Sequence, residues 1–128
     1  MIVMGAVSVV DEDGDSARRM ARREVAMYLV VVAELDPTLT LDPPLVEAVR
    51  SELAKGDPDA AGALIPHHVL DRFAFSGTPE QVAAQANALF AAGASRVEFG
   101  TPHGLTGEAG VDIIGRRVLP LLTVPAAG

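Results

Sequence analysis

The chain has 128 residues, of which 49% are hydrophobic and 21% are charged, and its mean hydropathy is +0.30. These values fit one domain with a hydrophobic core and argue against intrinsic disorder. The net charge of −7 disfavours binding to nucleic acid or to an anionic membrane, and the absence of cysteine excludes disulfides, thiolate metal sites and a cysteine nucleophile.

The first apolar segment, Ile2 to Val10, is rich in valine and almost without polar residues. We therefore predict a strand over residues 1–10 that is covered on both faces in a parallel sheet. The acidic turn that follows, Asp11 to Asp15, precedes a helix. Its carboxylates are interpreted as helix caps and solubilising groups in preference to ligands for a cation.

A long helix is predicted from Ser16 to Leu35. Its arginines at positions 18, 19, 22 and 23 invite a phosphate-binding interpretation, but their spread over the helix favours a solvated face. The apolar run from Val25 to Ala33 has about half of the ~20 residues that a membrane span requires, so we expect no membrane segment and a cytoplasmic protein. The stripe predicted to be buried consists of Ala17, Met20, Ala21, Met27, Tyr28, Val31 and Leu35.

Further helices are predicted from Pro43 to the residue before Gly56, and in short pieces between Pro58 and Arg72. Residues 16–72 would then form a helical insertion region between two strands. His67 and His68 are adjacent, and on a helix they would point about 100° apart. We interpret them as surface or half-buried polar contacts and predict no metal site.

The stretch from Phe73 to Gly104 has the order strand, helix, strand, loop, which is typical of a parallel sheet. Thr78 is predicted to cap a helix that begins at Pro79, with Gln81 completing a capping box. Gly93 is expected to end this helix. Its predicted buried stripe consists of Val82, Ala86, Leu89 and Phe90.

A short strand is predicted from Arg96 to Phe99, where alternation places Arg96 and Glu98 on one face as a possible ion pair. The residues from Gly100 to Gly104 are predicted to be a loop. A last helix is expected from Thr106 to Leu122, which completes a β-α-β-α unit over residues 73–122. Its predicted buried side consists of Val111, Ile114, Val118 and Leu121.

His103 follows the predicted end of a parallel strand, the edge at which α/β proteins place ligands. The loop around it offers a hydroxyl, an imidazole and two glycines, although a turn with a hydrogen-bonded histidine fits equally well. The helix start at Gly77 to Glu80 has unpaired amides that could bind phosphate. It matches no phosphate-binding fingerprint, and capping explains its residues.

Two long stretches resemble a known family: FAFSGTPEQVAAQANALFAAGASRVEFGTPHG and, after it, GVDIIGRRVLPLL. The earlier segments ARREVAMYLVVVAELDPTL and AAGALIPHHVLDRFAF are also similar to it. They resemble the C-terminal end of the luciferase-like flavin and coenzyme F420 oxidoreductases, in particular the methylenetetrahydromethanopterin reductase-like branch. The resemblance implies the C-terminal part of a (β/α)8 TIM-type barrel, with FMN or F420 bound at the C-terminal ends of the strands.

Members of that family transfer hydride or act as monooxygenases, so the resemblance implies a cofactor and a small-molecule substrate. It assigns no catalytic residue in this chain. The residues that fall at the cofactor end of the barrel, and would line or close its pocket, are Gly77, Thr78, Gly100, Thr101, His103 and Gly104.

The sequence supports three hypotheses. The leading one is a part or truncated relative of an F420- or FMN-dependent oxidoreductase, in which the cofactor does the hydride chemistry. The alternative is a non-catalytic half-barrel α/β module, a homo-oligomer or the partner of another chain, because an incomplete sheet leaves strand edges to be covered. The third is a non-functional remnant of a longer gene.

Overall fold

The computed structural model describes residues 3–35 and 41–123. Ile2, the first residue of the predicted N-terminal strand, lies outside these ranges. The elements in chain order are β1 (Val3–Val10), α1 (Gly14–Leu35), α2 (Pro43–Ala54), α3 (Pro58–Ala63), α4 (His67–Phe73), β2 (Ala74–Gly77), α5 (Pro79–Ala91), β3 (Arg96–His103), α6 (Gly107–Ile113), a π-helical turn (Ile114–Val118) and a 3-10 turn (Leu119–Leu121).

The three strands form one parallel sheet in the order β2-β1-β3. The α/β class with parallel strands and several helices is therefore confirmed. Here β1 is central, and β2 and β3, which are consecutive in the chain, lie on either side of it.

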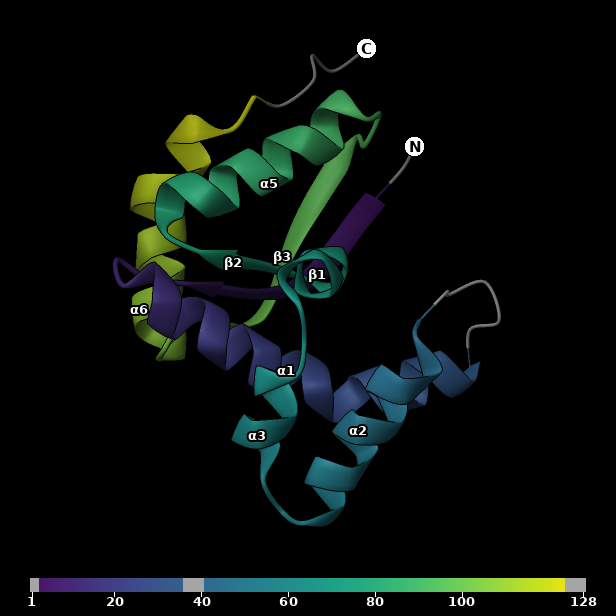
Figure 1. The fold of residues 1–128 in the computed structure, drawn as a ribbon. Coiled ribbons are helices and arrows are strands. Elements are labelled where there is room, and N and C mark those ends of the chain that lie inside the picture. Colours follow the sequence, from purple (N-terminus) through teal and green to yellow (C-terminus); the bar gives the residue numbers. More distant parts are fainter. Residues whose placement is uncertain (1–2, 36–40, 124–128) are drawn as a thin grey trace.

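This strand order places helices on both faces of the sheet, with α1 on one side and α5 on the other (Figure 1). Each face has its own hydrophobic core. The α1 side includes Val9, Val25, Leu29 and Leu70, and the α5 side includes Val10, Phe75, Val82 and Val118. The C-terminal half of β1 is buried on both faces, as predicted, whereas Met4 near its start is 41% exposed.

The strand β3 is twice as long as the predicted Arg96–Phe99 segment, and the loop predicted from Gly100 to Gly104 was wrong for all but its last residue. Val7 pairs with Gly100 and Val9 with His103, so β3 carries one extra residue, a β-bulge. The Thr101–Pro102 peptide bond in this bulge is cis. A bulge on an outer strand accommodates proline because no second neighbour needs its N–H, which explains how the strand continues.

Two predicted helix faces were partly wrong. In α1 the buried residues are Ala17, Ala21, Val25, Ala26 and Leu29, whereas the predicted Met27, Val31 and Leu35 are 46%, 51% and 77% exposed. The last helix changes from α to π geometry at Ile114 and to 3-10 geometry at Leu119. Ile114 and Val118 in the π-helical turn are buried, whereas Val111, in the α-helical part, and Leu121, in the 3-10 turn, are not.

Candidate functional site

The three strands are parallel, so their carboxyl ends lie at one edge of the sheet. Gly77 and Thr78 stand at this edge after β2, and His103 and Gly104 stand at the end of β3. Because β1 lies between β2 and β3, the structure does not make these two groups direct neighbours. The predicted site residues thus form two separate clusters near this edge, and Gly100 lies further back, in the middle of β3, where it pairs with Val7.

The turn after β2 is organised by helix capping. Gln81 Oε1 accepts from the Thr78 N–H at 2.8 Å, and the Gln81 N–H donates to Thr78 Oγ1 at 3.3 Å, which completes the predicted capping box. Gly77 has a φ of +127°, and a Cβ there would overlap the Gln81 carboxamide. Glycine is required at this position for the backbone conformation and for Gln81.

The glycines of the β3 cluster also make room for the chain itself. A Cβ at Gly100 would lie 2.8 Å from the carbonyl oxygen of Ala6, and one at Gly104 would lie 2.6 Å from the Cα of Gly110. These glycines therefore allow β1 and α6 to approach β3 closely.

His103 closes the β3 cluster in a left-handed conformation, with a φ of +76°. Its Nε2 lies 2.9 Å from the carbonyl oxygen of Phe99. A carbonyl can only accept, so Nε2 carries a proton, and in the neutral ring Nδ1 is then an acceptor. Thr101 is exposed, and its hydroxyl has no hydrogen-bond partner in the part of the chain that the structure describes. The cluster thus offers one hydroxyl and one imidazole nitrogen to a ligand.

A cluster of charges bridges the loop after β1 and the start of α5. Arg117, in the π-helical turn, pairs with Glu12 and, at 2.9 Å, with Glu80. The backbone N–H of Glu80 donates a hydrogen bond to the Glu80 carboxylate and lowers its pKa, and the hydrogen bond from Arg117 lowers this pKa further. The bond with Glu80 and the charge of Glu12 raise the pKa of Arg117. These contacts join three segments at the carboxyl edge.

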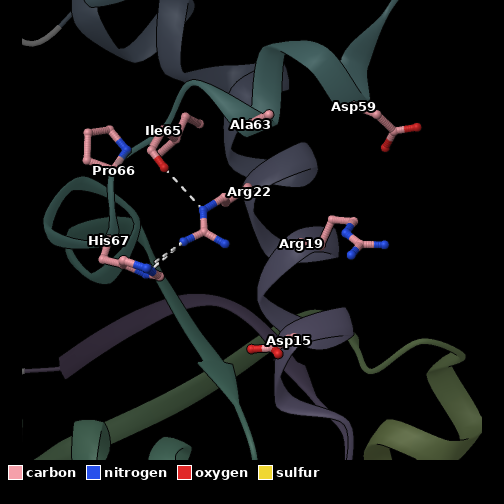
Figure 2. A pocket seen from close by; sticks show the side chains of 8 residues that line it. All are labelled: Asp15, Arg19, Arg22, Asp59, Ala63, Ile65, Pro66 and His67. Atoms are coloured by element: carbon pink, nitrogen blue, oxygen red, sulfur yellow. Dashed lines mark hydrogen bonds between the residues drawn. The ribbon is translucent and has the colours of Figure 1, made fainter.

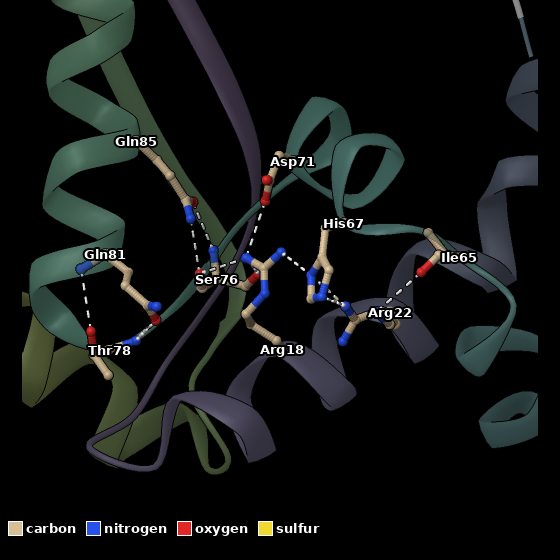
Figure 3. Close-up of polar contacts among 9 residues, drawn as sticks. All are labelled: Arg18, Arg22, Ile65, His67, Asp71, Ser76, Thr78, Gln81 and Gln85. Atoms are coloured by element: carbon tan, nitrogen blue, oxygen red, sulfur yellow. Dashed lines mark hydrogen bonds and ion pairs between the residues drawn. The ribbon is translucent and has the colours of Figure 1, made fainter.

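A polar network between α1, α4 and β2 was not expected from the sequence (Figure 3). The side chain of Arg18 is only 12% exposed, so the prediction of a solvated arginine face was wrong for this residue. Its Nη1 bonds Asp71 Oδ1 at 3.1 Å and the backbone oxygen of Ser76 at 3.2 Å, while its Nη2 reaches His67 Nδ1 at 3.0 Å. Arg18 thereby ties α1 to α4 and β2.

Arg22, one turn further along α1, belongs to the same network. Its Nε donates to the carbonyl oxygen of Ile65 at 3.1 Å, and its Nη2 lies 2.7 Å from His67 Nδ1. The i, i+4 spacing of Arg18 and Arg22, each directly after a buried alanine of α1, was the available signal. The predicted polar role of His67 is confirmed by these contacts.

Two smaller predictions have clear outcomes. Arg96 and Glu98 form an ion pair at 2.9 Å, as predicted, but both side chains are more than half exposed, so the pair adds little stability. Asp13 caps the start of α1, since Ser16 donates to it through both N–H and Oγ, at 3.2 and 2.7 Å. The bonds from Ser16 lower the pKa of Asp13.

Within residues 3–35 and 41–123, no three histidine, aspartate or glutamate side chains gather in a way that could hold a metal ion. Among the helices described, none combines the length and the apolar character needed to cross a bilayer.

Two relatives found by comparison with known proteins carry the same enzyme name. No family model matches the chain. It is 35% identical over 121 residues to the 5,10-methylenetetrahydromethanopterin reductase of Archaeoglobus fulgidus. The aligned region covers 88% of this chain and 36% of that enzyme. The enzyme of the same name from Methanopyrus kandleri is 27% identical over 114 residues, covering 87% of this chain and 32% of that enzyme.

A solved structure of a reductase also matches this chain. The coenzyme F420-dependent tetrahydromethanopterin reductase from Methanopyrus kandleri matches with a TM-score of 0.75 and 26% identity, over 92% of this chain and 34% of that one. The chain therefore spans about a third of the length of the relatives it matches, and the matched part is their C-terminal portion.

Proposed function

Because this chain is a partial relative of the 5,10-methylenetetrahydromethanopterin reductases, we propose that it forms part of a cytoplasmic F420-dependent oxidoreductase. The observation that carries the proposal is the shared fold, with a TM-score of 0.75 over 92% of the chain. The candidate residues lie at the carboxyl edge of the parallel strands, where α/β proteins bind cofactors.

Polar groups at the carboxyl edge of the sheet can contact one side of a bound cofactor. Thr101 has an exposed hydroxyl and His103 an acceptor nitrogen, and both groups lie at the end of β3. Gly77, Gly100 and Gly104, in contrast, are packed against the chain's own atoms. We therefore assign cofactor contact to Thr101 and His103, and a shaping role to the three glycines and to Thr78.

F420, when bound, supplies the hydride chemistry. The protein groups have the simpler task of binding and orientation. The Thr101 hydroxyl can donate to a cofactor carbonyl, and His103 Nδ1 can accept from a cofactor hydroxyl or N–H. The hydrogen bond to Phe99 fixes the tautomer that leaves Nδ1 free of a proton.

Variants at these two residues test the assignment. Thr101→Val removes the hydroxyl at an exposed position, and His103→Asn keeps a residue type that tolerates positive φ. Each is expected to weaken F420 binding severalfold, by the loss of about one hydrogen bond, with little change in melting temperature. His68→Asn, at an exposed histidine on α4, is the control and should bind as the unmodified chain does. Equal affinity in all four proteins would remove Thr101 and His103 from the site.

A second candidate function is a structural module that pairs with another chain or with a copy of itself. The outer edge of β3 has no neighbouring strand in the described part of the chain, and such edges favour pairing. Sedimentation velocity over a range of protein concentrations tests it. A stable dimer that binds neither F420 nor FMN would favour this function over the oxidoreductase.

A further inference from the structure

An open pocket of about 580 Å³ lies between α1 and the segment that joins α3 to α4 (Figure 2). Arg19 and Arg22 line it from α1, and His67 lines it from the start of α4. Ile65 and Pro66 add an apolar wall. None of the six carboxyl-edge candidates lines this pocket, so a ligand bound here is independent of the proposed function.

The hydrogen bonds of His67 indicate which of its ring nitrogens is the acceptor. Guanidinium groups can only donate, and both Arg18 and Arg22 bond the same ring nitrogen, Nδ1, at 3.0 and 2.7 Å. Nδ1 is therefore an acceptor, and the ring proton resides on Nε2. Nε2, which then carries the ring proton, lies 3.4 Å from Arg22 Nη2, so two donors face each other at the pocket without an acceptor between them.

The side chains that contact His67 carry more positive than negative charge. Arg18 and Arg22 approach each other through the shared imidazole, and Asp71 pairs only with Arg18, at 3.1 Å. No carboxylate of the described residues lies within 4.0 Å of the Arg22 guanidinium. Burial and the positive charge of Arg18 lower the pKa of Arg22, while the charges of Asp71 and Asp15 act in the opposite direction.

Donors remain available on this side of the pocket. Arg22 uses Nε for Ile65 and Nη2 for His67, which leaves Nη1 without a hydrogen-bond partner in the ranges described. The side chain of Arg19, on the same helix, makes no ion pair or hydrogen bond with any described residue. Planar guanidinium groups with free N–H donors match the oxygens of phosphate and carboxylate.

Two carboxylates also line the pocket, at opposite ends of it (Figure 2). Asp15 lies in the first turn of α1, and Asp59 lies on α3, with Oδ1 4.0 Å from Arg23 Nε. Arg19 and Arg22 stand between them, and His67 lies to one side, next to Arg22 (Figure 2). The two acids confine an anion to the middle of the pocket and limit its affinity.

We propose that the pocket beside Arg22 and His67 binds the oxyanion of a small molecule, a phosphate or a carboxylate group. The ligand oxygens take hydrogen bonds from Arg22 Nη1 and His67 Nε2–H, and Arg19 adds a third positive group. The negative charge of the bound oxyanion balances the guanidinium of Arg22, since Asp71 pairs with that of Arg18.

Calorimetric titration of the full chain with inorganic phosphate, and separately with succinate, tests the proposal, with sodium chloride at matched ionic strength as the blank. Saturable binding of one or both anions is expected. The stronger of the two identifies the headgroup as phosphate or carboxylate. No binding beyond the chloride blank in either titration would overturn the proposal.

Three arginine variants locate the site. Arg22→Gln should weaken binding about tenfold, the equivalent of one charge-assisted hydrogen bond. Arg22 also bonds the carbonyl of Ile65, so its replacement can disturb the fold. No described contact of the fold depends on the Arg19 side chain, which makes Arg19→Gln the safer variant. Arg19→Gln should weaken anion binding severalfold at an unchanged melting temperature. Arg116→Gln, at a side chain that is 78% exposed and far along the sequence, is the control. Equal losses in Arg19→Gln and Arg116→Gln would show diffuse charge attraction and contradict the site.

Discussion

The side chain of Gln85 occupies the place of a neighbouring strand beside Ser76. Its Oε1 accepts from the Ser76 N–H and its Nε2 donates to the Ser76 carbonyl, both at 3.0 Å. Ser76 is fully buried, and its carbonyl also accepts from Arg18. The outer edge of β2 is thus closed by side chains, whereas that of β3 has no neighbouring strand in the ranges described.

Replacing Gln85 by methionine keeps the length of the side chain and removes both bonds. The buried N–H of Ser76 then loses its acceptor, so the free energy of unfolding should fall by about 1–3 kcal/mol. Gln85→Glu retains the acceptor, and Arg18 still satisfies the Ser76 carbonyl, so a smaller loss is expected. Urea unfolding measures both. A methionine variant as stable as the unmodified protein would show that this edge does not need closing.

The contact between α6 and the end of β3 depends on Gly110. A Cβ at this position would overlap the backbone of His103 and Gly104, so Gly110→Ala should destabilise the fold by about 1–3 kcal/mol. Gly115→Ala is the matched control, because nothing lies within 4 Å of its Cβ position. It should be neutral or stabilising by up to about 1 kcal/mol. Thermal unfolding compares them, and equal melting temperatures would contradict the close packing.

Tyr28 is the only tyrosine, and the chain has no tryptophan, so phenolate absorbance reports this residue alone. Burial, with a smaller effect of Glu24, raises the pKa of Tyr28 to about 12. Because the folded pKa exceeds the ordinary value of 10.0, the neutral phenol stabilises the fold fully below pH 10 and loses this effect as the pH rises toward 12. A spectrophotometric midpoint near the ordinary value in the folded protein would contradict this environment.

The Arg117 cluster predicts sensitivity to acid. The pKa of Glu80 is lowered from 4.5, so its stabilising effect is present above that value and is lost as the pH falls through the folded pKa. Urea midpoints of the unmodified chain should therefore fall between about pH 5 and pH 3. Arg117→Gln should make this fall smaller, while Arg116→Gln should leave it unchanged. An identical fall in Arg117→Gln would mean that the ion pairs do not contribute.

Local signals were sufficient for several of these features. Thr78, Pro79 and Gln81 predicted the start of α5 correctly because a capping box involves only residues within one turn. The Asp13 cap and the ion pair of Arg96 with Glu98 were also predictable, since each depends on residues two or three positions apart.

Features that depend on distant segments were not predictable. The sequence around Pro102 favours a loop, and only pairing with β1 continues β3 through the bulge. Arg18 appears solvent-exposed on a helical wheel, but Asp71 and Ser76 from later segments cover it. The candidate site residues were predicted from the ends of the strands, but the central position of β1, which separates the two clusters, is a property of the strand order alone.

The most direct test of the central claim is a fluorescence titration of the 128-residue chain with coenzyme F420, with FMN in a parallel titration. A part of an F420-dependent oxidoreductase should bind F420 saturably, at one site per chain, and bind it more tightly than FMN. Saturable binding of FMN alone would contradict the choice of cofactor. Binding of neither, by a chain whose circular dichroism shows it to be folded, would contradict the oxidoreductase proposal itself.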